Sequence, residues 1–236
     1  MNRKPLNRKA YGSIGHLPSS RLGPGDWCVT EGQARICTEK ARDKHDNVIV
    51  QEKLDGSCTA VALVNGEIIA LSRAGYLANT SPYEQHHLFA DWVEQNESRF
   101  RATLKEGERI VGEWLAQARG TIYDLSNHEP WSAFDIMQGG TRLIFYEFLD
   151  RIAGNFGNPS LLSIGEACSV LKAIRIHKMQ HVPCDSIEGI VYRVERKGKV
   201  DFLAKWVRPD KVDGKHLPKV SGKEAVWNWK PEACNV

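Results

Sequence analysis

The chain has 236 residues, of which 42% are hydrophobic and 26% are charged, and its formal net charge is +3 at pH 7. These proportions are typical of a soluble globular domain that folds on its own, and the charge is too small to identify a nucleic-acid-binding protein by itself. The six cysteines contain no C-x-x-C pair, which argues against a zinc site. No apolar run is long enough to cross a bilayer, so we expect a monomer that does not bind membranes and acts in the cytoplasm, or in the host cytoplasm if the source is viral.

The first 46 residues are rich in glycine, proline, serine and charge, which predicts a loop-rich segment packed on the core. We place the core at residues 47–210 and a short basic tail at residues 211–236. Lysine and arginine gather at the amino end and again from Arg193 to Lys223. They could line one phosphate-facing surface, or they could be two solvated ends.

Three strands are predicted at the start of the core. The stretches VIVQEKL from Val48, CTAVALV from Cys58 and EIIALSR from Glu67 alternate apolar and polar residues. Turn residues separate them at Asp55-Gly56 and at Asn65-Gly66. The pattern predicts a strand-turn-strand-turn-strand meander.

Two helices are predicted from capping boxes. Ser81 is followed by a proline and then by Glu84, and Ser163 is followed three residues later by Glu166. The expected apolar faces carry Leu88, Phe89, Trp92 and Val93 in the first helix, and Ala167, Val170, Leu171 and Ile174 in the second.

Further strands are predicted at RIVGEWLA from Arg109, SAFDIM from Ser132 and RLIFYEF from Arg142, followed by a hairpin around Gly198. Many antiparallel strands with a few helices predict an α+β domain.

Lys53 ends the first predicted strand, and a tight turn of Leu54, Asp55, Gly56 and Ser57 follows it at once. An amine that attacks a phosphate must first lose its proton, and we expect partial desolvation and nearby cations to lower the pKa of Lys53 enough for this. A KLDG sequence on its own is more typical of a surface lysine beside a turn. The hypothesis of a nucleophile therefore depends on the motifs that follow.

Those motifs occur in a fixed order, each near a strand end. They are EKLDGS around Lys53, SRAG with Arg73, VGEW with Glu113, AFDI with Phe134 and Asp135, EGIV from Glu188 to Val191, and FLAKWVR with Lys205. In this order they resemble the motifs of the covalent nucleotidyltransferases, the superfamily of ATP-dependent DNA ligases, RNA ligases and messenger-RNA capping enzymes. The resemblance spans residues 51–208. It implies a nucleotidyltransferase (ligase adenylation) domain of antiparallel sheets with flanking helices.

The resemblance also implies site roles. Lys53 would be the nucleophile that accepts AMP, with Asp55 orienting it or helping to hold a metal. Glu113 would accept hydrogen bonds from the ribose, and Phe134 would stack on the purine. Arg73 and Lys205 would neutralise phosphate charge. Glu52 and Arg208 complete the expected nucleotide-binding set.

The expected cofactors are ATP and Mg²⁺, for which Mn²⁺ could substitute. Glu188 and Glu113 are the candidate metal ligands, because carboxylate oxygens suit a hard cation. Each residue also has an ordinary explanation: Phe134 as core, Arg73 as a surface charge, Glu188 as a strand-end carboxylate. The ordered set of motifs favours the functional interpretation.

Two features depart from the superfamily pattern. The fifth motif usually carries two lysines one residue apart, but Leu203 and Val207 flank Lys205 at the two candidate positions. Arg208 could supply the second cation if the strand twists or bulges there. Too few residues follow for the OB-fold domain that closes over the nucleotide in DNA ligases and capping enzymes, so we expect no OB-fold domain. The lysine-bearing tail, with Trp227 and Trp229, could contact nucleic acid or be a poorly ordered end.

These points favour a small RNA ligase. The segment YGSIGHLPSS, which contains His16, is also similar to an amino-terminal stretch of phage RNA-ligase-like proteins, although His16 could equally be an ordinary loop residue. The expected activity is ATP-dependent joining of 5′-phosphate and 3′-hydroxyl ends of RNA, or of DNA or an RNA/DNA hybrid, through a lysyl-AMP intermediate. The alternatives are a DNA ligase, a capping-type guanylyltransferase and a non-catalytic nucleic-acid-binding relative.

Overall fold

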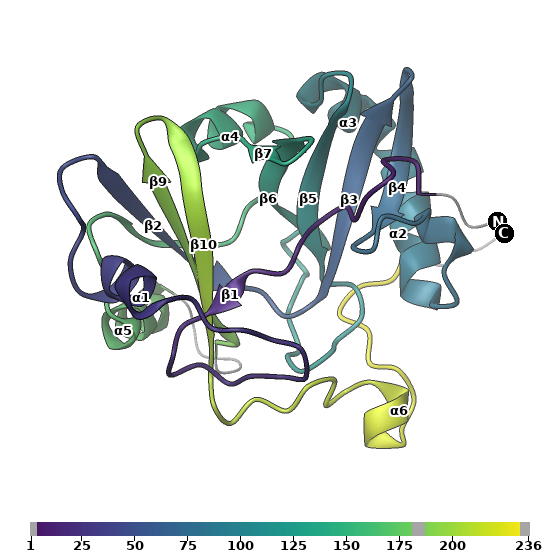
Figure 1. The fold of residues 1–236 in the computed structure, drawn as a ribbon. Coiled ribbons are helices and arrows are strands. Elements are labelled where there is room, and N and C mark those ends of the chain that lie inside the picture. Colours follow the sequence, from purple (N-terminus) through teal and green to yellow (C-terminus); the bar gives the residue numbers. More distant parts are fainter. Residues whose placement is uncertain (1–3, 181–186, 232–236) are drawn as a thin grey trace, which may run out of the picture.

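The computed structural model describes residues 4–180 and 187–231, which form two mainly antiparallel sheets with helices around them (Figure 1). Sheet A has the order β1 (Gly15–His16), β10 (Lys199–Val207), β9 (Gly189–Arg196), β2 (Asp46–Lys53) and β8 (Leu161–Gly165). Sheet B has the order β4 (Glu67–Ser72), β3 (Ser57–Val64), β5 (Glu108–Trp114), β6 (Trp131–Gln138) and β7 (Thr141–Arg142). The predicted α+β class is confirmed.

Helices pack against each sheet. A core cluster joins sheet A to α1 (Glu31–Thr38) and α5 (Val170–Gln180). A larger, aromatic cluster joins sheet B to α2 (Glu84–Gln95), α3 (Glu97–Thr103) and α4 (Phe145–Ile152). A third cluster brings Ala10 and Tyr11 of the amino-terminal segment against sheet B. The remaining short elements are η1 (Ala78–Thr80) and α6 (Pro218–Ser221).

The predicted three-stranded meander is wrong at its first turn. β2 pairs with β8 and β9, so both of its edges are occupied, and β3 lies in the other sheet. The turn at Asp55-Gly56 therefore crosses from sheet A to sheet B, and a Cβ atom at Gly56 would clash with the carbonyl oxygen of Trp114. The β3–β4 hairpin is confirmed, and Asn65 and Gly66 both have the positive φ that such a two-residue turn requires.

Both predicted helix starts are corrected. The first helix begins at Glu84 rather than at the Ser81 cap, because the Ser81 hydroxyl lies 2.6 Å from His86 Nδ1 instead of capping the first turn. Ser163 lies inside β8, where the edge of β2 offers it ladder hydrogen bonds, and the helix begins only at Val170. Leu171, expected on the apolar face, is 69% exposed.

Several helices occur where none was predicted, among them α4 and α1. Residues expected as the strand RLIFYEF form β7 and then α4, whose buried residues Phe145, Phe148 and Ile152 have helical rather than alternating spacing. The Phe145 amide at the start of α4 donates to Glu195 Oε1 at 2.6 Å. A carboxylate from a distant part of the sequence therefore accepts one of the amide hydrogen bonds that the first turn of a helix leaves free. The loop-rich segment contains α1, which opens with a Thr30–Gln33 capping box.

Candidate active site

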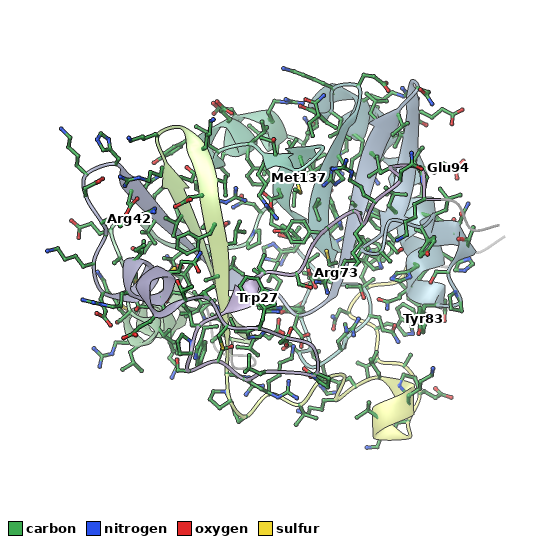
Figure 2. All side chains as sticks on the ribbon, viewed as in Figure 1. Trp27, Arg42, Arg73, Tyr83, Glu94 and Met137 are labelled. Carbon is green, nitrogen blue, oxygen red and sulfur yellow. The ribbon has the colours of Figure 1, made fainter. Side chains whose placement is uncertain are left out.

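A cavity of about 620 Å³ lies between the two sheets. It is lined by eight of the nine predicted site residues: Glu52, Lys53, Asp55, Arg73, Glu113, Phe134, Glu188 and Lys205. Figure 2 labels one of them, Arg73, near the centre of the view, between Arg42 on the left and Glu94 on the right. The crossover between the sheets explains this arrangement, because it carries the chain from Lys53 directly past Glu113.

Arg208 is the predicted site residue that the structure does not bring to the cavity wall. Its guanidinium donates to Asp210 at 2.9 Å, and its amide donates to the carbonyl of Glu188. The expectation that Arg208 is the second cation of the fifth motif is not supported by this placement.

Lys53 sits at the end of β2, with its Nζ 2.7 Å from Glu188 Oε2. Burial lowers the pKa of Lys53, but the negative charges of Glu188 and then of Glu113 outweigh burial, and the net effect raises it. The expected lowering of the Lys53 pKa is therefore wrong. The cations were expected to dominate, whereas the nearest partners are carboxylates.

Asp55 is almost fully buried in the turn between β2 and β3, where it hydrogen-bonds to the loop that follows β5. Its Oδ2 accepts from the Gly120 amide at 2.9 Å, and its own amide donates to the Tyr123 hydroxyl at 2.8 Å. These bonds fix the turn that follows Lys53. Asp55 is thus placed to orient Lys53 through the backbone.

Glu113 lies across the crossover, where its Oε1 accepts from the Gly56 amide at 3.0 Å. Burial raises the pKa of the Glu113 carboxyl to about 7, against the opposing charge of Lys53. The carboxyl therefore changes its charge near neutral pH.

The raised pKa of Glu113 gives a stability prediction. The folded state holds this proton more tightly than the unfolded state, so Glu113 makes the free energy of unfolding fall as pH rises from about 4.5 to 7. Glu113→Gln keeps an acceptor for the Gly56 amide and removes the ionisation. We expect it to raise the free energy of unfolding at pH 8 by about 1–3 kcal/mol, with a smaller gain at pH 5. Urea titrations at both pH values measure this, with exposed Glu97→Gln as control, and an equal effect at both pH values would contradict it.

Phe134 lines the cavity, and its ring packs against the ring of Tyr11. Its ring lies 5.2 Å from that of Tyr11 in an edge-to-face contact. The neighbouring Asp135 is fully buried and accepts hydrogen bonds from Tyr11, Arg142 and Arg193. A rigid aromatic face is therefore available for a base.

Arg73 and Lys205 are the expected phosphate-binding cations. Arg73 donates to the Ser13 hydroxyl at 3.0 Å, and Lys205 Nζ lies 3.8 Å from Asp26 Oδ1. Burial lowers the pKa of Lys205, and the positive charge of Lys53 adds to this effect. Among the described residues, the carboxylate nearest to Lys205 is this loosely placed Asp26, and Arg73 bonds to a hydroxyl, so both cations are available for a phosphate.

Glu52 and His16 occupy supporting positions. Glu52 lines the cavity and lies 3.3 Å from His177 of α5. His16 is 2% exposed, is 2.7 Å from the Ser20 hydroxyl and 3.1 Å from Asp26, and its strand β1 pairs with β10 at Lys205. It lies behind the wall of the cavity.

Several cavity residues were not predicted as site residues, among them Lys211, Arg119 and His86. Lys211 Nζ lies 3.1 Å from Asp55 Oδ1 and also contacts Glu188 Oε1. The sequence contains no signal that separates Lys211 from the other lysines of the tail.

The oxygen donors of the cavity suit a hard divalent cation, since Asp55, Glu113 and Glu188 all line it. Within residues 4–180 and 187–231, no group of three or more His, Cys, Asp or Glu side chains is arranged to hold a metal ion. A metal here would use one or two carboxylates together with phosphate oxygens and water, as Mg²⁺ commonly does.

No helix in the described part of the chain is long and apolar enough to cross a membrane.

Solved ligases share this fold at low sequence identity. A putative ATP-dependent DNA ligase from Aquifex aeolicus is 19% identical, with a TM-score of 0.51, and the match covers 84% of this chain and 49% of that chain. A mutant of Naegleria gruberi RNA ligase with ATP and Mn is 16% identical, with a TM-score of 0.51 and coverage of 84% and 60%. An archaeal ATP-dependent RNA ligase is 22% identical, with a TM-score of 0.49 and coverage of 69% and 42%. The chain thus matches about half the length of these ligases.

No curated protein matches the chain in sequence. The family model described as RNA ligase matches residues 46–207, which is more than half of the 236 residues and includes every strand that lines the cavity. The protein therefore belongs to the RNA ligase family.

Proposed function

We propose that the protein is an ATP-dependent RNA ligase that joins 5′-phosphate and 3′-hydroxyl ends through a lysyl-AMP intermediate on Lys53. The observation that carries this proposal is the position of Lys53 Nζ in a cavity that also presents Phe134, Glu113, Arg73 and Lys205. A nucleophile, a stacking ring, a carboxylate and two phosphate-binding cations are the parts that nucleotidyl transfer needs. Membership of the RNA ligase family supports RNA as the polynucleotide.

The first step forms the bond between Lys53 Nζ and the α-phosphorus of ATP and breaks the bond to the leaving pyrophosphate. Lys53 must give up its proton to solvent before it attacks, and its ion pair with Glu188 opposes this. Binding of ATP must therefore weaken the ion pair. A magnesium ion, or manganese in its place, would offset phosphate charge, and Glu188 and Glu113 are the residues that would hold it.

Two further steps complete the reaction. A 5′-phosphate oxygen of the polynucleotide attacks the AMP phosphorus, and the bond to Lys53 breaks. A 3′-hydroxyl oxygen then attacks the 5′-phosphorus, AMP leaves, and the hydroxyl proton goes to solvent. Throughout, Arg73 and Lys205 would stabilise the charge on the transferred group in a partly desolvated site.

A labelling experiment tests the proposal. The purified protein is incubated with magnesium and either α-labelled ATP or α-labelled GTP, run on a denaturing gel, and digested for mass spectrometry. We expect label from ATP and a mass increase of one AMP on the peptide that contains Lys53. Label from GTP would indicate a capping-type guanylyltransferase, and no label from either would indicate a binding protein without this chemistry.

The same labelled protein tests the polynucleotide. It is mixed with a nicked duplex whose 5′-phosphate and 3′-hydroxyl strands are RNA, DNA or one of each. Sealing of RNA ends faster than DNA ends is expected, because a site that contacts the 2′-hydroxyl distinguishes the two. Faster sealing of DNA ends would make the protein a DNA ligase.

A further inference from the structure

The segment that follows β10, here called the C-terminal strap (residues 208–231), packs onto the loop of residues 115–123. Ala118 donates its amide to the Val226 carbonyl at 2.9 Å, and His216 donates its amide to the Arg119 carbonyl at 2.7 Å. Asn228 adds a bond from its amide to the Ala116 carbonyl at 2.8 Å. Figure 1 shows the strap running beneath both sheets. This segment lies outside residues 46–207, the part that matches the family model.

The strap carries Lys211 into the cavity wall. The Lys211 side chain is only 9% exposed, and its Nζ contacts Asp55 Oδ1 and Glu188 Oε1. Glu188 uses its other oxygen, Oε2, for Lys53. One carboxylate therefore contacts two ammonium groups, so movement of Glu188 toward a metal ion or away from the cavity removes one partner from each lysine, while Lys211 keeps its contact with Asp55.

The charge of a bound triphosphate explains why a second lysine in the cavity matters. Lys53 must be neutral when it attacks, so it cannot offset the charge of the bound triphosphate at that moment. Leu203 stands at one of the two positions where a second cation of the fifth motif was expected, and Arg208 is turned to Asp210. Lys211 is a cation in contact with the nucleophile's own partner.

We propose that Lys211 of the C-terminal strap is a phosphate-binding residue for the tail of a nucleoside triphosphate, and that it supplies the second lysine missing from the fifth motif. The Nζ atoms of Lys211 and Lys53 contact different oxygens of the Glu188 carboxylate, so the two ammonium groups lie on either side of it. In this proposal, a nucleotide whose α-phosphate lies at Lys53 places a phosphate beyond the α-phosphate within reach of Lys211. This inference rests on the proposed function, in which Lys53 marks the position of the α-phosphate.

Equilibrium binding in a protein without the nucleophile tests the inference. In the Lys53→Met background, Kd is measured by calorimetry for ATP and for AMP, with and without Lys211→Met. Loss of one charge-assisted contact is expected to weaken ATP binding about tenfold or more and AMP binding less than twofold. Lys211→Arg should retain most of the ATP affinity, and the exposed Lys172→Met should change neither Kd.

Equal losses for ATP and AMP, or no loss for either, would overturn the inference and leave Lys211 as a structural ion-pair partner. So would a Lys53→Met protein that does not bind ATP. A second measurement does not depend on the folding of Lys211→Met: lysine acetylation of the Lys53→Met protein, followed by mass spectrometry, should show protection of Lys211 by ATP and not by AMP. Failure of the proposed function is seen separately, as wild-type protein that binds ATP but takes up no label.

Discussion

Lys53→Ala is expected to abolish labelling by ATP, with a loss of about 10⁴-fold or more in the rate of AMP transfer to the protein. The variant removes the atom that forms the covalent bond, and no other group can take its place at the same position. Labelling by α-labelled ATP under the conditions given above measures the effect. Lys172→Ala, at an exposed helix position that does not line the cavity, is the matched control and should be labelled normally.

Lys53→Arg separates the charge of Lys53 from its nucleophilicity. A guanidinium keeps the positive charge beside Glu188 but does not give up a proton in a protein. We therefore expect Lys53→Arg to remain folded, to bind ATP and to take up no label. Label on Lys53→Ala would show that the nucleophile lies elsewhere, and Lys205 and Lys211 would be the next residues to replace.

The raised pKa of Lys53 is a property of the site that the motifs could not predict. The motifs identify Lys53, Glu113 and Glu188 as members of one site, and the structure brings their side chains to one cavity. The motifs do not give distances. The sign of the pKa shift depends on the 2.7 Å contact between Lys53 and Glu188, which joins residues 135 positions apart.

Lys211 was missed for a related reason. It lies in a polar, lysine-bearing stretch that resembles a solvated tail, and its role depends on hydrogen bonds between the strap and the loop of residues 115–123. Such contacts leave no periodic pattern in the sequence. A functional residue on an irregular segment is therefore harder to predict than one at the end of a strand.

The fold was predictable where local signals agree with the final pairing. The β3–β4 hairpin follows from alternation and an Asn-Gly turn, and the β9–β10 hairpin follows from the turn around Gly198. Alternation determines which side chains share a face but not which strand is the neighbour, so the placement of β2 and β3 in different sheets could not be predicted. At Ser163 a local capping signal was overridden by pairing with β2.

Asp135→Ala is expected to lower the free energy of unfolding by about 3–5 kcal/mol, the largest stability effect of any single substitution considered for this protein. Asp135 lies on sheet B with 0% exposure, and Arg193 lies on sheet A with 3% exposure. Their ion pair, at 2.5 Å, joins the two sheets, and Arg142 and Tyr11 donate to the second Asp135 oxygen at 3.0 and 2.9 Å. Removal of the carboxylate leaves the buried Arg193 guanidinium without its compensating charge.

Two further variants distinguish the effect of the buried Asp135 charge on stability from the effect of an exposed ion pair. Asp135→Asn keeps one of the two acceptor oxygens and the size of the side chain but not the charge, so we expect a smaller loss than for Asp135→Ala. Glu97→Ala breaks an exposed ion pair with Arg101, in which both side chains are more than 40% exposed, and should cost no more than about 0.5 kcal/mol. Urea unfolding at pH 7 measures all three variants. If Asp135→Ala is no less stable than Glu97→Ala, the buried pair contributes no net stability, and the join between the sheets must depend on their apolar contacts instead.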